Sequence, residues 1–184
     1  MNETLDLDLV AGAVRQAMAL ILVVGAAHKL RLGAAFGGIV AAYRLLPQPL
    51  LAPATWLLPR LELAAAAALL WPGLALLSVA PALMLLLPMT LAVAINLARG
   101  RSEIDCGCGG TRGQGLSNGL VVRNIVLMLS LLCAARPLHL AALGVGGIAL
   151  MSALGLALSS LYFSSSQLLA NARQWRVLVG ADRA

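Results

Sequence analysis

Charged residues are scarce in this chain. Asp, Glu, Lys and Arg make up 11% of its 184 residues, whereas 61% of the residues are hydrophobic. A soluble domain carries about 25% charged residues, so most of this chain must be surrounded by lipid. The apolar residues come in long runs and do not alternate with polar ones. This pattern excludes a transmembrane β-barrel and leaves a helical bundle.

Aromatic residues and a basic leader segment are also lacking. Aromatics make up 4% of the chain and are not interleaved with basic residues, so the net charge of +6 does not indicate nucleic acid as a partner. The basic residues stand instead at the ends of apolar runs, where they face lipid headgroups. Residues 1–9 are acidic and lack the basic segment of a signal peptide, so no cleavage is expected.

The apolar runs predict an all-α integral membrane protein with a single membrane domain, residues 1–184. We expect a four-helix transmembrane bundle with a fifth, C-terminal transmembrane helix packed on its outside. No charge occurs from Leu63 to Ile95, which is too long for one span of roughly 30 Å, and Trp71-Pro72-Gly73 provides a natural break. Arg15 should extend to the membrane interface, and residues 33–49 predict a short interfacial helix. The predicted spans cover about residues 9–30, 51–71, 74–97, 118–135 and 138–163, with a polar loop at 99–116.

Cysteine is rare as well, yet two of the three cysteines lie one residue apart in the polar loop. These are Cys106 and Cys108, with Gly107 between them. Arginines on either side and a following helix N-terminus favour the thiolate, which is the species that attacks disulfides. A disulfide across one residue closes a small, strained ring that is easily reduced. The pair is therefore predicted to be a catalytic thiol–disulfide centre, with a soft-metal carrier site and an inert pair as the alternatives.

A metal site and a role for the third cysteine find less support. Zinc sites usually separate two cysteines by two to four residues and add a second ligand pair, which this chain lacks. No metal ligands are therefore assigned. Cys133 lies near the far end of its predicted helix, roughly 20 Å or more from the loop. We expect it to be a buried, inert thiol that does not pair with Cys106 or Cys108.

Five antiparallel spans would bring most polar side chains to the face of the cysteine loop and leave the opposite face nearly bare. Ionisable groups at membrane depth are costly and often functional. Glu62 should point inward, either in an ion pair with Lys29, Arg60 or Arg123 or in a proton-handling role. Asn96 and Asn124 should form interhelical hydrogen bonds. The residues expected to support the cysteines in a polar, cationic pocket are Lys29, Arg60, Glu62, Asn96, Arg99, Asp105, Arg123 and Asn124.

Several segments within roughly residues 9–135 carry a family resemblance, and they are His28-Lys29-Leu30 with Phe36, Tyr43-Arg44-Leu45-Leu46-Pro47, Pro59-Arg60-Leu61-Glu62-Leu63, Ala94-Ile95-Asn96-Leu97 through Arg99-Gly100-Arg101 to Ile104-Asp105-Cys106-Gly107-Cys108-Gly109, and Leu120-Val121-Val122-Arg123-Asn124. With these segments the chain resembles the MauE family of methylamine-utilisation membrane proteins, within the wider DoxX-like group. The resemblance implies a role in maturing a disulfide-rich periplasmic enzyme, the small subunit of methylamine dehydrogenase, together with a thioredoxin-like partner. A more distant similarity to redox bundles of the DsbB and vitamin K epoxide reductase type implies quinone as a cofactor, which the residues themselves do not show.

Two arguments about orientation in the bacterial inner membrane disagree. Short loops rich in Lys and Arg remain in the cytoplasm. On the side opposite the cysteine loop, Arg15 and Arg136 are the basic residues expected. The N-terminus would then lie outside and the cysteine loop would face the cytoplasm. The resemblance implies instead that the cysteines face the periplasm.

Overall fold

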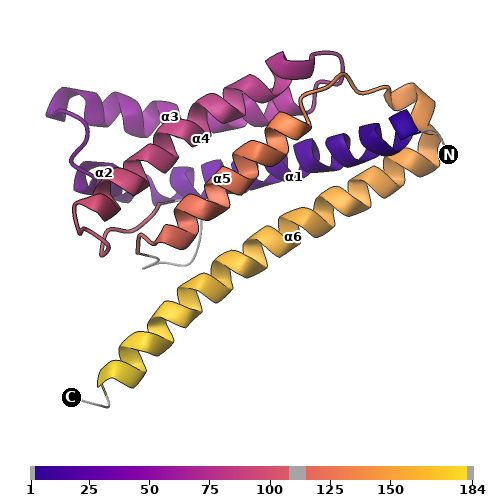
Figure 1. The fold of residues 1–184 in the computed structure, drawn as a ribbon. Helices are drawn as coiled ribbons and strands as arrows, with labels where there is room; N and C mark the ends of the chain where they lie inside the picture. Colours follow the sequence, from indigo (N-terminus) through magenta and orange to yellow (C-terminus); the bar gives the residue numbers. More distant parts are fainter. Residues whose placement is uncertain (1–2, 108–114, 182–184) are drawn as a thin grey trace.

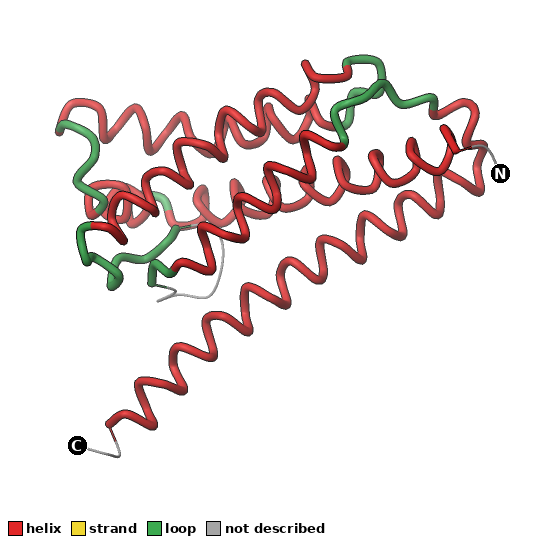
Figure 2. The backbone as a smooth tube through the Cα atoms, in the orientation of Figure 1, coloured by secondary structure: helices red, strands yellow, loops and turns green. Residues whose placement is uncertain are grey.

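The computed structural model describes residues 3–107 and 115–181, and these residues form six helices (Figures 1 and 2). An isolated β-bridge between Asp105 and Gly115 closes the polar loop. The described residues contain no longer strand, which agrees with the predicted all-α class. The helices are α1 (Glu3–Leu32), α2 (Ala34–Ala42), α3 (Gln48–Leu69), α4 (Ala75–Ala98), α5 (Asn118–Cys133) and α6 (Leu140–Ala181).

The predicted break in the long uncharged stretch is confirmed. α3 ends at Leu69 and α4 begins at Ala75, so Trp71-Pro72-Gly73 lies between them. Among the described helices, α1, α4 and α6 are long and apolar enough to cross a membrane. α5 is apolar but has only 16 residues, and α3 carries the charges of Arg60 and Glu62. These helices are compatible with a membrane protein, and the count of five spans stays a prediction.

α1 lies at the centre of the packing. It contacts α3 on one side and α6 on another, while α4 packs against both α3 and α5 (Figure 1). Small residues along α3 allow its neighbours to approach closely. The apolar core between α1, α3, α4 and α5 contains Met18, Leu22, Ala65, Ala66, Leu69, Val79, Ala82 and Leu131.

α6 follows α1 near its start and then diverges from the other helices (Figure 1). Gly144, at φ +62°, interrupts the helical backbone close to the beginning of α6. Further along, a Cβ on Gly155 would lie 3.2 Å from the carbonyl oxygen of Ala13, so α1 and α6 are in close contact there. Within the apolar stretch Leu140–Leu168, the buried residues are Gly155, Ser159 and Ser166. This agrees with the prediction of a helix packed on the outside of the bundle.

The end of the molecule opposite the cysteine loop is not bare, contrary to the prediction. Arg15 was expected at the interface, but it is only 1% exposed. Its guanidinium donates hydrogen bonds to the carbonyl oxygens of Leu69 (2.9 Å), Arg136 (3.3 Å) and Trp71. Carbonyls at helix C-termini have no partner within the helix, so a buried guanidinium can satisfy them. The prediction was wrong because these carbonyls come from chain segments far away in the sequence.

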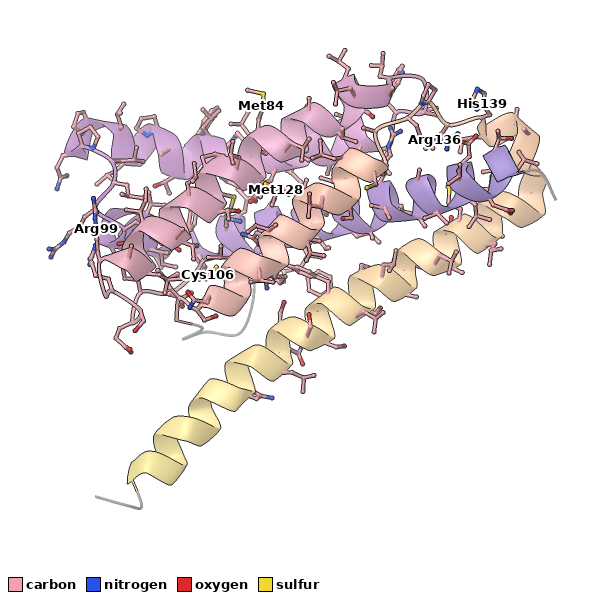
Figure 3. All side chains as sticks on the ribbon, in the orientation of Figure 1. Met84, Arg99, Cys106, Met128, Arg136 and His139 are labelled. Carbon is pink, nitrogen blue, oxygen red and sulfur yellow. The ribbon has the colours of Figure 1, made fainter. Side chains whose placement is uncertain are left out.

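A buried carboxylate lies at the same end. Asp8 is 1% exposed, and its oxygens lie 3.1 Å from Arg136 Nε and 3.0 Å from His139 Nδ1. The backbone N–H of His139 also donates to Asp8, at 3.1 Å. Figure 3 shows Arg136 and His139 beside the first turns of α1. Asp8 therefore connects the start of α1 to the segment between α5 and α6.

Candidate functional site

Cys106 lies in a small apolar cluster at the end of the bundle where α4 ends and α5 begins. The cluster combines Cys106 with Val93 of α4 and with Leu116 and Leu120 at the start of α5. Cys106 is 7% exposed and disulfide-bonded. Cys108 lies outside the described residues, so the structure describes the predicted pair only at Cys106.

The backbone around Cys106 is held by local interactions. Asp105 bridges to Gly115, and its side-chain Oδ1 accepts a hydrogen bond of 3.0 Å from the N–H of Gly107. Such Asx turns are common where a chain reverses. Gly107 has φ +65°, and a Cβ there would lie 3.1 Å from Ile39 and 3.5 Å from Phe36. Position 107 therefore needs glycine for its backbone conformation and for the close approach of α2.

α2 is fastened to the cysteine loop by polar contacts at its C-terminal end. The hydroxyl of Tyr43 donates to the carbonyl oxygen of Cys106 at 3.2 Å. Arg101 donates to the carbonyls of Ala42 (2.7 Å) and Tyr43 (3.3 Å) and to Oδ1 of Asn96 (2.9 Å). Burial and the nearby negative charge of Asp105 raise the pKa of Tyr43, so its hydroxyl remains a neutral donor. We call Arg101, Asn96 and Tyr43 the α2 clamp.

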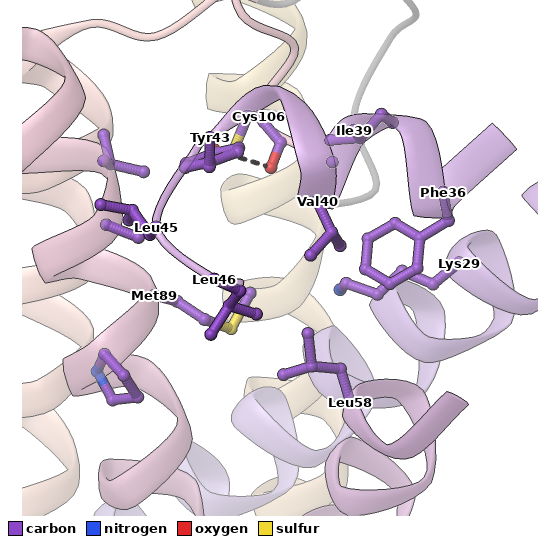
Figure 4. A pocket seen from close by; sticks show the side chains of 14 residues that line it. Lys29, Phe36, Ile39, Val40, Tyr43, Leu45, Leu46, Leu58, Met89 and Cys106 are labelled. Atoms are coloured by element: carbon purple, nitrogen blue, oxygen red, sulfur yellow. Dashed lines mark hydrogen bonds between the residues drawn. The ribbon is translucent and has the colours of Figure 1, made fainter. Parts of the chain in front are cut away.

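A cavity of about 310 Å³ lies beside Cys106, between α2, α3 and α4 (Figure 4). The sequence predicted a polar, cationic pocket here, and that prediction was wrong. Apolar side chains form nearly all of the wall, and among the described lining residues Lys29 is the one with a charge. The lining consists of Lys29, Phe36, Ile39, Val40, Tyr43, Leu45, Leu46, Leu58, Pro88, Met89, Ala92, Val93, Cys106 and Gly107.

The charge of Lys29 is matched by Glu62, as predicted. The ammonium nitrogen lies 2.7 Å and 3.0 Å from the two carboxylate oxygens, and both side chains are buried. The ammonium also lies 5.9 Å from the centre of the Phe36 ring. Because the pair is internally neutral, it contributes little net charge to the cavity. The prediction that Glu62 faces the bundle interior and binds a basic residue is confirmed.

Arg60 and Arg99 do not support the cysteines, contrary to the prediction. Arg60 is exposed, stacks over the ring of Trp56 at 3.8 Å and donates to the Trp56 carbonyl. Arg60 and Glu62 are two residues apart on a helix, so they point to different sides, a signal already present in the sequence. Arg99 is exposed, and Figure 3 shows it pointing away from the helices. Arg101, which was not in the predicted set, makes the inward contacts instead.

Arg123 also differs from its predicted role as a partner of Glu62. Its guanidinium donates to the hydroxyl of Ser166 at 2.8 Å and lies 4.7 Å from the ring centre of Tyr162. It therefore connects α5 to α6. Asn124, the next residue, is buried. The predicted interhelical hydrogen-bond role of Asn124 stays a prediction.

Asn96 is completely buried at the end of α4. Its amide donates to the carbonyl of Ala92 at 3.0 Å, and its side-chain oxygen accepts from Arg101. It therefore acts within α4 and on the α2 clamp. Within the described residues, the Asn96 side chain makes no hydrogen bond to another helix.

Cys133 is a free thiol, as predicted, but it is exposed on the outside of α5. The prediction of a buried thiol was wrong because the rotation of α5 places Leu131, two residues earlier, in the core instead. Within residues 3–107 and 115–181, no group of three His, Cys, Asp or Glu side chains could hold a metal ion.

Comparison with known proteins supports the resemblance noted in the sequence. The family model described as methylamine utilisation protein MauE matches residues 7–139. The methylamine utilization protein MauE of Methylophilus methylotrophus is 40% identical over 152 residues, 80% of each chain. The protein of the same name from Paracoccus versutus is 39% identical over 176 residues, 91% of each chain. No solved structure matches the chain. The chain belongs to the MauE family of methylamine utilisation proteins.

Proposed function

We propose that this chain is a membrane thiol–disulfide redox protein of the MauE type. It exchanges disulfides through Cys106 and Cys108 with a thioredoxin-like partner. In this way it supports the maturation of a disulfide-rich periplasmic enzyme of the methylamine dehydrogenase type. The observation that carries the proposal is the disulfide at Cys106, in a loop whose backbone is held by Asp105, Gly107 and the α2 clamp.

A purely structural role for this disulfide is a weaker explanation. The stabilisation from a disulfide depends on the length of chain that it closes, and two cysteines separated by one residue close almost none. The helices are held together instead by the apolar core and by the Lys29–Glu62 pair. A bond that adds little stability in a well-positioned loop is better suited to exchange.

Cysteine substitutions test the proposal. Cys106→Ser and Cys108→Ser should each abolish maturation of the client enzyme while the protein remains inserted and folded. Cys133→Ser is the matched control and should have little effect, since this thiol is free and lies outside the core. Maturation is measured as client activity and client disulfide content in cells expressing each variant.

Trapping of mixed disulfides gives a second measurement. If one thiol attacks and the other resolves, only one of the two single-cysteine variants should accumulate a mixed disulfide with the thioredoxin-like partner. Full client activity in the Cys106→Ser, Cys108→Ser double variant would refute the redox function. Stoichiometric soft metal on reduced thiols, without mixed disulfides, would favour a non-enzymatic carrier or assembly factor instead.

We also propose that the protein lies in the bacterial inner membrane with its N-terminus outside. Arg99 caps the end of α4 beside the cysteine loop and is exposed, so it counts among the interfacial basic residues that favour the cytoplasmic side. In this orientation the loop meets cytoplasmic thiols. Impermeant thiol labelling of a cysteine introduced at Glu103 tests this, because labelling from the periplasm would reverse the orientation.

A further inference from the structure

The cavity beside Cys106 extends from the cysteine loop to the outside of the bundle at membrane depth. Its lining includes Cys106 of the loop and the exposed residue Leu46 (Figure 4). Pro88 also lines it and is exposed, roughly 15 Å from the end of α4 at 1.5 Å per residue. Because α4 is long and apolar enough to cross a membrane, this side of the cavity opens towards the hydrocarbon chains of the lipid.

The interior of the cavity suits a hydrocarbon chain and excludes a charged group. Apolar side chains form nearly all of its wall, and the charge of Lys29 is matched by Glu62 at 2.7 Å. A charged group that entered would lose its hydration and find no free counter-charge among the described lining residues, which is costly. A hydrocarbon chain gives up no hydrogen bonds on entering, and the volume of about 310 Å³ falls in the range of small-molecule sites.

An exposed cation adjoins the lining of the cavity. Arg44 lies between Tyr43 and Leu45, which both line the cavity, and two positions before the exposed lining residue Leu46. The side chain of Arg44 is exposed, and its guanidinium has no hydrogen bond and no ion pair with any described residue. A guanidinium binds the oxygens of a phosphate group through short, charge-assisted hydrogen bonds. The cavity is therefore bordered by a group that can bind an anion which itself stays outside.

We propose that the cavity binds one acyl chain of an anionic glycerophospholipid, and that Arg44 binds the phosphate of this lipid outside the cavity. Lipid headgroups are expected at this end of the bundle, because α1 ends there with Lys29 and Arg31, and Arg99 caps α4. The bound chain fills the space beside Cys106. This inference goes beyond the proposed redox function and does not depend on it.

Lipid titration of the full-length protein tests this binding site. The protein is delipidated in detergent, and native mass spectrometry follows the binding of dioleoyl phosphatidylglycerol and, separately, of dioleoyl phosphatidylcholine. Phosphatidylglycerol should saturate at one tightly bound lipid per chain, with a Kd about fivefold lower than that of phosphatidylcholine, since one interfacial basic residue contributes a factor of this size. Equal Kd values would overturn the role of the anionic headgroup. Inorganic phosphate should not displace the lipid, and displacement would mean a free-anion site and would overturn the proposal.

Substitutions of Arg44 test which residue binds the phosphate. Arg44→Gln should remove the preference for phosphatidylglycerol, whereas Arg44→Lys should keep most of it because the positive charge is retained. Arg99→Gln is the matched control, since Arg99 is exposed at the same end of the bundle and does not line the cavity. A preference that survives Arg44→Gln, or that is lost equally in Arg99→Gln, would overturn the assignment of Arg44.

Cavity-filling variants test where the acyl chain lies. Ala92→Phe narrows the cavity and should remove the saturable binding of both lipids, whereas Leu91→Phe, on the exposed side of the same helix, should retain it. If Ala92→Phe fails to fold, Val40→Trp in α2 with Ala41→Trp as its control makes the same comparison. Saturable binding that survives in the cavity-filling variant would overturn the proposed site. None of these measurements involves a thiol, so a failure here is distinguishable from a failure of the proposed redox function.

Discussion

At the scale of single residues, the buried pair of Lys29 and Glu62 is the most consequential polar contact near the cavity. Both side chains are almost completely inaccessible, and each satisfies the charge of the other at 2.7 Å. Taking two charges out of water costs several kcal/mol per ion, and the attraction between them offsets this cost only while both are present. The contribution of either residue to the stability of the folded protein therefore depends on the presence of the other.

Removing one partner should destabilise the protein strongly. We expect Lys29→Met and Glu62→Gln each to lower the free energy of unfolding by about 3–5 kcal/mol, because an uncompensated buried charge is left behind. The double variant Lys29→Met, Glu62→Met should recover most of this loss, since it leaves no charge unpaired. Unfolding in detergent, followed by circular dichroism, measures the three values.

Arg60→Met provides the comparison for these variants. Arg60 is exposed and contacts Trp56 on its own helix, so its loss should change the free energy of unfolding by no more than about 1 kcal/mol. A double variant no more stable than the worse single variant would contradict this account of the pair.

At the scale of elements, α2 covers the cysteine loop because its C-terminal carbonyls are bound from outside. Arg101 provides this binding, and Asn96 at the end of α4 holds the guanidinium in place. Arg44, which follows the clamp residue Tyr43, is the one non-glycine residue with positive φ in the described chain, at +50°. Such a conformation persists only where the surroundings hold it.

Loss of the clamp should expose Cys106. In a reduced variant with Cys106 as its single cysteine, Arg101→Gln should raise the rate of alkylation several-fold, because α2 loses its binding to the loop. Arg99→Gln removes the same charge from an exposed position nearby and should leave the rate unchanged. Equal rates in the two variants would mean that Arg101 does not position α2.

At the scale of the whole molecule, α6 packs on the outside of the bundle. It packs against α1 along the part that includes Gly155, and most other side chains of its apolar stretch are exposed. Asp8, with Arg136 and His139, ties the segment before α6 to the first turns of α1. Arg123 makes a second connection, to Ser166 and Tyr162 further along.

Neutralising Asp8 should loosen the attachment of α6. In Asp8→Asn, hydrogen exchange in residues 134–139 should become faster, because the ion pair with Arg136 is lost. The effect on the free energy of unfolding should be smaller than at Glu62, since Arg136 and His139 are 30% and 69% exposed and interact with water. Asp6→Asn, at an exposed position on the same helix, should leave the exchange rates unchanged. Unchanged hydrogen exchange in residues 134–139 of Asp8→Asn would contradict the proposed role of Asp8 in holding this segment against α1.

Much of the architecture follows from the sequence by itself. Long apolar runs define helices because lipid leaves no other partner for the backbone. Trp71-Pro72-Gly73 separates α3 from α4 because proline and glycine end helices. The inward position of Glu62 was also predictable, since a carboxylate at that depth needs a cation. The segments resembling the MauE family were sufficient to recognise the family that the comparisons establish.

Only the tertiary structure decided which polar residues work together. The rotation of each helix about its own axis depends on its neighbours, and it turned Arg60 outward and exposed Cys133. The partners of Arg101, Arg15 and Asp8 belong to segments that are distant in the sequence and meet only in the folded chain. Composition and helical periodicity do not predict which distant segments meet. For the same reason the space beside Cys106 is an apolar cavity: α2 folds back over it, and the charges expected there lie elsewhere.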